Sequence, residues 1–159
     1  MRRNQAGFSL MELIVVMGII AGTLAIGIPR FNRSTLNLSS AEQALIATLR
    51  TARANATGRG VHFRVTIAST SYTVQRLKLD VSGNWVADGM FPSQTFSAPP
   101  TISFSIVSGD GVVEFDSRGM VVPPPGLAVS EIETLRVRDT RTNTTKNISV
   151  WPSGQALEV

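Results

Sequence analysis

The spacing of hydrophobic positions divides the chain into three zones. Residues 8–28 are almost uniformly apolar, with hydrophobic side chains at fifteen of these 21 positions. Between residues 30 and 57, apolar residues recur every three or four positions without Pro or Gly, which is typical of an amphipathic helix. Beyond Gly60 they occur at every second position, which is typical of strands with one buried face. The pattern predicts an α+β protein with one long N-terminal helix packed on an antiparallel β-sheet domain.

The first two zones predict a continuous helix from about Phe8 to Ala56, on the order of 70 Å long at 1.5 Å per residue. Gly58 and Gly60 should end it. One stripe of this helix should pack on the rest of the domain, and it consists of Leu38, Ala41, Leu45, Leu49, Ala52 and Ala56.

About seven short strands are expected after the helix. The clearest covers residues 61–67, where apolar and polar side chains alternate without interruption. The other six are expected at 72–79, 85–86, 102–106, 112–115, 135–137 and 148–150, and residues 156–159 could add a further short one. The polar stretch 140–145 is expected to be a loop between two of these strands.

The apolar zone is long enough to cross a bilayer, because a helix of its length spans about 30 Å. Arg2 and Arg3 precede it, which places the N-terminus in the cytoplasm. Glu12 is the only charged residue within it, and a carboxylate costs roughly 2.5–3.5 kcal/mol at the bilayer centre. Three interpretations remain open: a cleaved secretory signal, a plain membrane anchor, or a segment in which Glu12 pairs with a cation from another chain.

Composition and charge narrow the range of functions. The chain has no Cys and one His, which excludes disulfide frameworks and leaves little room for metal or triad chemistry. No set of nucleophile, base and orienting residue is recognisable, so we expect no enzyme activity, no cofactor and no metal site. The net charge of +4 conceals opposed blocks, since residues 30–78 carry eight basic side chains and one acid, while residues 80–133 carry seven acids and one basic side chain.

Two groups of side chains in the strand region suggest binding chemistry. His62 could titrate or ligate, but with no second His or Cys we expect a solvated strand residue. Several acids could in principle hold Ca²⁺, but their spacing matches no EF-hand loop, so we expect solvated turns. These acids are Asp110, Glu114, Asp116, Glu131 and Glu133.

The N-terminal residues resemble the class III signal of type IV pilins and of the pseudopilins of type II secretion. Gly7, Phe8 and Glu12 follow a short basic leader and precede a long apolar tail, as in that family. The resemblance implies cleavage between Gly7 and Phe8 by a prepilin peptidase and N-methylation of Phe8. It also implies that Glu12 pairs with the terminal amino group of a neighbouring subunit, which sets the register between subunits.

This resemblance divides the chain into three parts. Residues 1–7 are the leader peptide, residues 8–29 form a transmembrane helix that later lies in the filament core, and residues 30–159 form a periplasmic or extracellular domain. The chain is then a single-pass protein of the bacterial inner membrane before it enters a pilus or pseudopilus. Its implied partners are the prepilin peptidase and N-methyltransferase, other pilins or pseudopilins, and the inner-membrane assembly platform.

Packing and bending of the apolar helix are expected at three small or rigid residues. Gly18 and Gly22 form a G-x-x-x-G pattern, which either brings two helices into close contact or reflects the general abundance of Gly in such helices. Pro29 predicts a kink, or loss of helix before it on assembly, because its ring removes a helical hydrogen bond.

Three strings in the remaining sequence resemble the GspH/FimT family of minor pseudopilins and minor pilins. They are Leu49–Arg53, Val113–Gly119 and Ile148–Gln155. The resemblance implies a structural subunit at or near the tip of a type II secretion pseudopilus or a type IV pilus. Major pilins usually carry a C-terminal disulfide loop, which a chain without Cys cannot form.

Binding of DNA during natural transformation is the alternative function, because some FimT-like minor pilins use C-terminal arginines for it. The last six residues here contain no Arg. A basic patch for nucleic acid could still form from Arg136, Arg138, Arg141 and Lys146.

Overall fold

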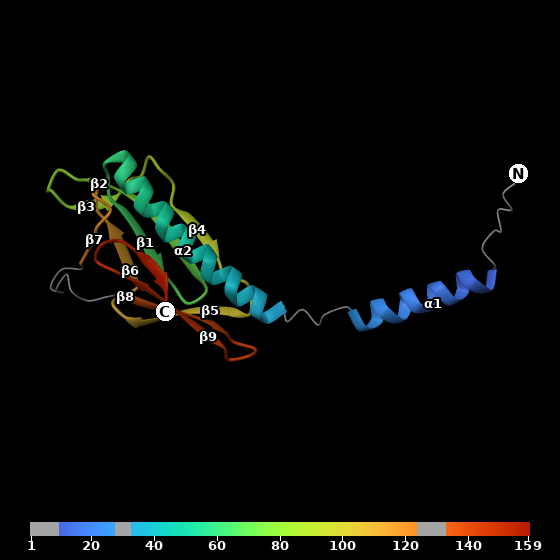
Figure 1. Ribbon diagram of the computed structural model, residues 1–159. Coiled ribbons are helices and arrows are strands. Elements are labelled where there is room, and N and C mark those ends of the chain that lie inside the picture. Colours follow the sequence, from blue (N-terminus) through green and yellow to red (C-terminus); the bar gives the residue numbers. More distant parts are fainter. Residues whose placement is uncertain (1–9, 28–32, 124–132) are drawn as a thin grey trace, which may run out of the picture. The chain divides into compact units, whose positions relative to one another are not determined.

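The computed structural model describes residues 10–27, 33–123 and 133–159 (Figure 1). The chain forms two compact units, residues 1–32 and 33–159, and each is described by itself. The predicted continuity between the two helical zones falls on residues outside the described ranges, so it stays a prediction.

The first unit contains one helix, α1 (Leu10–Gly27). Its large apolar side chains between Leu10 and Ile20 are exposed to between 45% and 77%. Such exposure on every side of a helix is unusual in a soluble domain, where one face is normally buried. The helix therefore carries apolar surface that its own unit does not cover.

The second unit opens with α2 (Arg33–Arg59). Gly60 follows it in a left-handed conformation with φ +64°, and the N–H of Val61 donates to the carbonyl of Ala56 at 3.2 Å. This is the Schellman arrangement that commonly ends helices, so Gly60 ends α2 as predicted, whereas Gly58 lies within the helix, which continues three residues beyond Ala56. The predicted packing stripe is also confirmed, since all six of its residues are at most 7% exposed.

Ten strands follow α2 in the described part of the chain. They are β1 (Phe63–Ile67), β2 (Ser71–Leu79), β3 (Trp85–Ala87), β4 (Gln94–Ser97), β5 (Ile102–Ser108), β6 (Val112–Phe115), β7 (Val121–Val122), β8 (Glu133–Asp139), β9 (Thr145–Val150) and β10 (Ala156–Glu158). They form two antiparallel sheets. In the first the order is β3-β2-β1-β6-β7, with β4 also pairing with β2, and in the second it is β10-β9-β8-β5.

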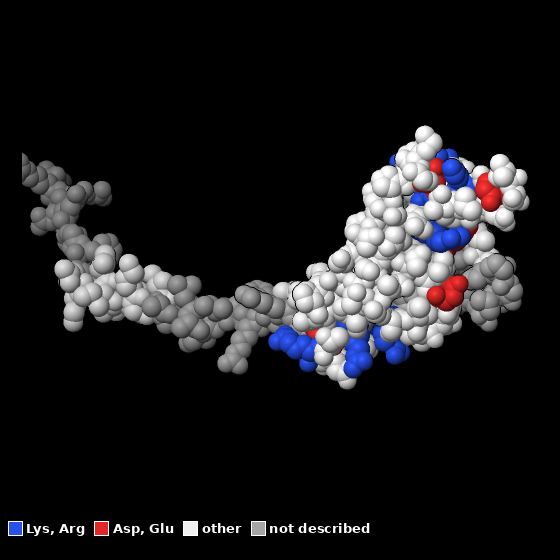
Figure 2. Space-filling model, turned by 180° about the vertical axis from the view of Figure 1, so that it is seen from behind, with Lys and Arg blue, Asp and Glu red and all other residues white. Residues whose placement is uncertain are grey.

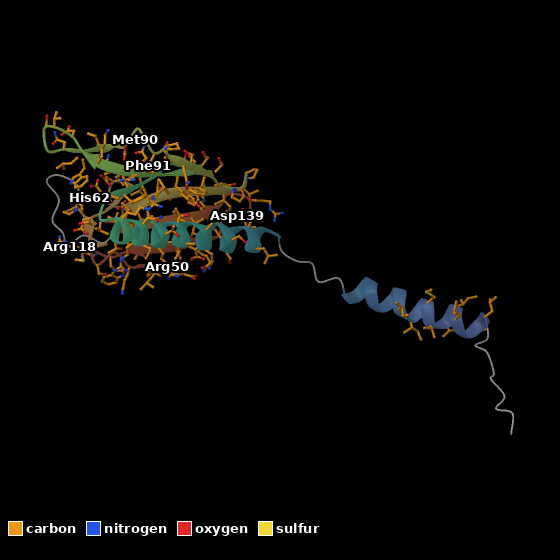
Figure 3. The ribbon with its side chains drawn as sticks, turned by 90° about the horizontal axis from the view of Figure 1, so that it is seen from above. Arg50, His62, Met90, Phe91, Arg118 and Asp139 are labelled. Carbon is orange, nitrogen blue, oxygen red and sulfur yellow. The ribbon has the colours of Figure 1, made fainter. Side chains whose placement is uncertain are left out.

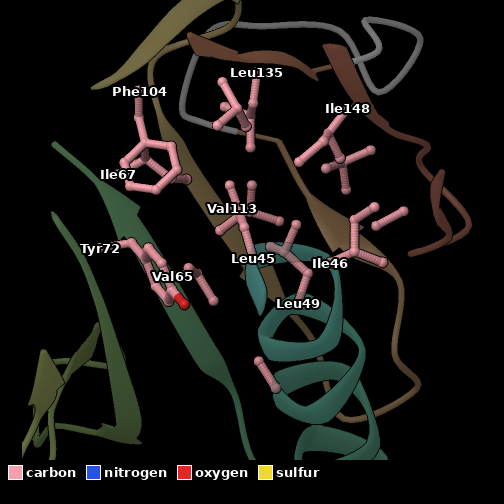
Figure 4. Close-up of a cluster of buried hydrophobic side chains, with 14 of the residues drawn as sticks. Leu45, Ile46, Leu49, Val65, Ile67, Tyr72, Phe104, Val113, Leu135 and Ile148 are labelled. Atoms are coloured by element: carbon pink, nitrogen blue, oxygen red, sulfur yellow. The ribbon is translucent and has the colours of Figure 1, made fainter. Parts of the chain in front are cut away.

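The core lies between α2 and both sheets, so the predicted α+β class is confirmed (Figures 1 and 4). Figure 4 shows Leu45 and Leu49 of α2 surrounded by side chains from several strands. On β1 the alternation is as predicted, with Phe63, Val65 and Ile67 buried. The helix therefore contacts both sheets through one hydrophobic cluster.

Two strands were not predicted, and a third begins inside an expected loop. β4 has four exposed residues, and β7 has only two, so neither carries an alternating pattern. β9 begins at Thr145, inside the stretch that was expected to be a loop. Thr145 pairs there with Arg138 of β8. The hydrogen-bonded ladder extends beyond the buried residues, where hydrophobic spacing carries no information.

Candidate functional site

The residues of the predicted leader signal lie mostly outside the described ranges. This is the case for Gly7, Phe8 and Pro29, whose roles stay predictions. Glu12 is the third residue of α1, and Gly18 and Gly22 lie further along the same helix, four residues apart and therefore on one side of it. A Cβ atom at Gly18 would meet nothing within 4 Å, so this side of the helix has room for a close neighbour.

Residues 8–29, which include α1, were expected to cross a membrane. Within the described ranges, no helix combines the length and hydropathy of a membrane-crossing segment. The predicted span begins two residues before α1, at a position that lies outside these ranges.

In the second unit, the three strings that suggested a minor subunit come together at the C-terminal end of α2. Arg53 of α2 donates from Nε to the carbonyl of Gly119 at 3.0 Å. The N–H of Val121 donates to the carbonyl of Pro152 at 3.0 Å. The turn after β6, the turn after β9 and the helix are thereby held as one cluster by hydrogen bonds to main-chain oxygens.

The close approach at this cluster requires glycine. A Cβ atom at Gly154 would lie 2.1 Å from the carbonyl oxygen of Gly119 and 2.8 Å from Nε of Arg53. Gly154 also has φ +80°, which side-chain-bearing residues rarely adopt. The contact between the two turns thus explains why residue 154 is a glycine.

Asp116 fixes the first of these turns. Its Oδ1 accepts the N–H groups of Arg118 and Met120, each at 2.9 Å, and its Oδ2 accepts Nε of Arg118 at 2.9 Å. Burial alone would raise the pKa of Asp116, but the hydrogen bonds from Met120 and Arg118 and the Arg118 charge bring it below its usual value. Asp116 is therefore a structural carboxylate that holds the turn beside Arg53.

The four residues of the predicted nucleic-acid patch do not lie together. Arg136 and Arg138 lie on the outer face of the second sheet, whereas Lys146 pairs in register with the buried Val137 and lies on the inner face. Arg141 lies in the turn between β8 and β9 and is exposed. Figure 2 shows Lys and Arg side chains of one face in separate groups with uncharged surface between them.

Lys146 joins the inner face to α2. Its Nζ donates to Glu42 and to Glu158, at 2.6 Å in both cases. Glu42 is fully buried, and its second oxygen has no hydrogen-bond partner within the described part of the chain. The hydrogen bonds to Glu158 and Glu42 raise the pKa of Lys146, so this residue stays charged and bound to two carboxylates.

The expectation that His62 is solvated is wrong. Its side chain is 12% exposed, its ring stacks on Trp85 with centroids 3.7 Å apart, and Nδ1 lies 2.9 Å from Glu114. Arg64 also pairs with Glu114, at 2.8 Å. The pairing of β1 with β6 places Arg64 opposite Glu114, and this register brings the three charged groups together.

The expectation of solvated acids is also wrong for Glu114, Asp116 and Glu133, whereas Asp110 is exposed and Glu131 lies outside the described residues. Glu133 is 8% exposed, and its Oε1 accepts the N–H of Gly111 at 2.8 Å. Burial, with the negative charge of Asp110, raises the pKa of Glu133 to about 7, although the Gly111 bond opposes the shift. Nothing in the hydrophobic pattern distinguishes Glu133 from its acidic neighbours.

Glu133→Gln is expected to flatten the dependence of stability on pH. Between its ordinary pKa of 4.5 and the folded value of about 7, the folded chain binds more protons than the unfolded chain. The free energy of unfolding therefore falls as the pH rises through this range, by about 3 kcal/mol. Gln stays neutral and still accepts from Gly111, so urea denaturation between pH 4.5 and 8 should show little change for the variant. Equal slopes for the two proteins would contradict this origin.

Residues 2–21 match the family model of the prokaryotic N-terminal methylation motif. No curated protein matches the chain. The fold resembles that of the type IV minor pilin FimU of Pseudomonas aeruginosa, with a TM-score of 0.56 and 17% identity over 77% of this chain and 87% of FimU.

A second similar fold belongs to a subunit of a secretion system. The minor pseudopilin EpsH from the Type 2 Secretion System of Vibrio cholerae matches with a TM-score of 0.50 and 15% identity, over 74% of this chain and 91% of EpsH. At these identities the likeness shows the fold alone. The chain thus combines an N-terminal methylation motif with a pilin-like fold, and the predicted resemblance to pilins and pseudopilins is confirmed.

Proposed function

We propose that the chain is a minor pilin or pseudopilin, a structural subunit of a type IV pilus or of a type II secretion pseudopilus. The observation that carries the proposal is an N-terminal methylation motif leading into an apolar helix whose described large side chains are exposed. Apolar surface of this extent needs either lipid or other helices around it. In this proposal lipid surrounds the helix while the chain is in the membrane, and the helices of neighbouring subunits surround it in the filament core.

In this proposal each part of the N-terminus has one role. Residues 1–7 are removed between Gly7 and Phe8, and Phe8 is then methylated. Residues 8–29 anchor the chain in the inner membrane and later lie in the filament. Glu12 pairs with the terminal amino group of a neighbouring subunit. The sequence of α1 contains no basic residue that could compensate this carboxylate, so its counter-ion comes from another chain.

The domain of residues 30–159 lies in the periplasm and is displayed at or near the filament tip. Its support is the likeness to FimU and EpsH, which are minor subunits. The proposed partners are other pilins or pseudopilins and the inner-membrane assembly platform. A structural role, rather than catalysis, fits a domain whose motif residues hold turns and main-chain oxygens together.

Binding of DNA is the second candidate, and it now rests on Arg136 and Arg138. Their neighbours in register are Ser105 and Asn147 for Arg136, and Ser103 and Thr145 for Arg138. No acid faces either arginine in these pairs, so a phosphate group meets no repulsion there. This candidate stands second because Lys146 is bound to carboxylates on the opposite face.

The N-terminus of the protein extracted from host membranes tests the proposal directly. We expect mass spectrometry to find a methylated Phe8 as the first residue. Glu12→Ala should be cleaved normally but recovered from sheared filaments at roughly a tenth of the normal level or less, because a neighbouring amino group loses its counter-ion. Thr23→Ala is the matched control in the same helix and should assemble normally. An intact Met1, cleavage after Ile28, or normal assembly of Glu12→Ala would contradict the proposal.

A further inference from the structure

A cleft lined by arginines lies on one side of α2. It has a volume of about 280 Å³, and its walls are Arg50, Arg53, Ala54, Thr57 and Arg118. Figure 3 shows Arg50 and Arg118 on the side of α2 away from Met90 and Phe91. The cleft is separate from the outer sheet face that carries Arg136 and Arg138, and neither the methylation motif nor the predicted assembly residues contribute to it.

Two arginines of the cleft, Arg50 and Arg53, are held in place by main-chain oxygens and not by carboxylates. Arg53 donates to the carbonyl of Gly119 at 3.0 Å, and Arg50 donates to the carbonyl of Ala156 at 3.4 Å. None of the ion pairs among the described residues involves either of them. Like charges one helical turn apart repel each other. The fold thus places two guanidinium groups at one cleft, and neither belongs to an ion pair among the described residues.

Arg118 adds a third guanidinium from a different segment. Its side chain is 81% exposed and is oriented by Asp116, whose carboxylate it contacts at 2.8 Å. Ala54 and Thr57 of α2 have short side chains, which leave the cleft open between the arginines. Guanidinium groups bind carboxylates with two parallel hydrogen bonds, so this arrangement suits the side chain of an aspartate or glutamate.

The two turns that meet at Arg53 also expose large apolar side chains. Met120 closes the first turn and is 41% exposed, and Trp151 opens the second and is 44% exposed. Arginine, tryptophan and methionine are the residues in which protein–protein interfaces are enriched. A nucleic acid instead engages a stripe of cations along its backbone, which a single small cleft with apolar neighbours does not provide.

We propose that this cleft is a contact surface for an acidic segment of another pilin-like subunit. A carboxylate of that subunit enters between Arg50 and Arg118, and apolar side chains around it cover Met120 and Trp151. The inference rests on the proposed function, because it places the partner within the same filament. It adds a contact made by the globular domain, in addition to the contacts of the apolar tail.

Site-specific photo-crosslinking in the host bacterium tests this proposal on the full chain. The photoreactive residue p-benzoylphenylalanine replaces Ala54 inside the cleft, and in a control it replaces Thr66, an exposed residue of β1. We expect the Ala54 variant to form an adduct with a chain that carries an N-terminal methylation motif, through a peptide containing Asp or Glu. Adding Arg50→Glu and Arg118→Glu should reduce this adduct roughly tenfold or more. Replacing the partner's acid with Arg should restore it.

The other outcomes overturn the proposal in distinguishable ways. No adduct from Ala54 in a chain that is present in the filament fraction overturns the contact surface and leaves the proposed function intact. An adduct with DNA or lipid, or an adduct that the charge reversals do not reduce, assigns the cleft to a different ligand. A chain that is neither cleaved after Gly7 nor found with filaments removes the proposed function and this inference together.

Discussion

Gly154→Ala is expected to destabilise the domain by roughly 3 kcal/mol or more. The left-handed conformation of Gly154 alone costs a side-chain-bearing residue about 1–2 kcal/mol. In addition, the new methyl group would lie 2.1 Å from the carbonyl oxygen of Gly119. That oxygen already accepts Nε of Arg53, so it cannot move without loss of the bond between α2 and the turn. Crowding of this kind typically adds 1–3 kcal/mol.

Gly83→Ala is the matched control for this prediction. Gly83 has nearly the same conformation, with φ +82°, but a Cβ atom there would meet nothing within 4 Å. We expect Gly83→Ala to cost only about 1 kcal/mol, and the difference between the variants measures the close approach of the two turns. Urea denaturation of residues 33–159, the unit that contains the whole buried core, gives both values. Equal losses would show that the turns can separate without consequence.

Most of the fold follows from hydrophobic spacing. The stripe from Leu38 to Ala56 is buried on α2, and the alternation from Phe63 to Ile67 gives β1, because burial of apolar surface determines both. β4 and β7 were not predicted because their pairing depends on main-chain hydrogen bonds with β2 and β6 rather than on buried side chains. The spacing of apolar side chains does not predict such bonds.

For the candidate sites, the sequence identified several residues but not the tertiary contacts that they make. Gly154 was identified as part of a string, but its reason is a contact with Gly119, which is 35 residues earlier in the chain. Lys146 and Arg138 are both basic residues near one hairpin, yet strand register places them on opposite faces of the sheet. The register of β1 and β6 also brings Glu114 next to Arg64, and His62, expected at the surface, is a largely buried partner of the same carboxylate. These outcomes depend on tertiary pairing, which no local spacing specifies.

The ion pair between Glu42 and Lys146 is expected to show the second large effect. Glu42 is fully buried in α2, and Lys146 of β9 is the residue that compensates its charge, at 2.6 Å. Lys146→Met should cost about 3–5 kcal/mol, because it leaves a buried carboxylate without a counter-ion. The loss should be visible in urea denaturation of residues 33–159 near neutral pH. The expected cause is the desolvated charge of Glu42 rather than the loss of the lysine side chain itself.

Two further variants separate these causes. In the double variant Glu42→Leu, Lys146→Met, the buried charge is absent, so we expect most of the lost stability to return, with a coupling energy of about 2 kcal/mol or more. Glu158→Gln removes the other carboxylate on the same Nζ, at the same distance of 2.6 Å, but Glu158 is 49% exposed. That variant should cost at most about 1 kcal/mol, because water replaces the partner. If Glu158→Gln proved as damaging as Lys146→Met, distance rather than burial would determine the strength of these pairs. If the double variant were no more stable than Lys146→Met, the loss would come from the lysine side chain and not from Glu42.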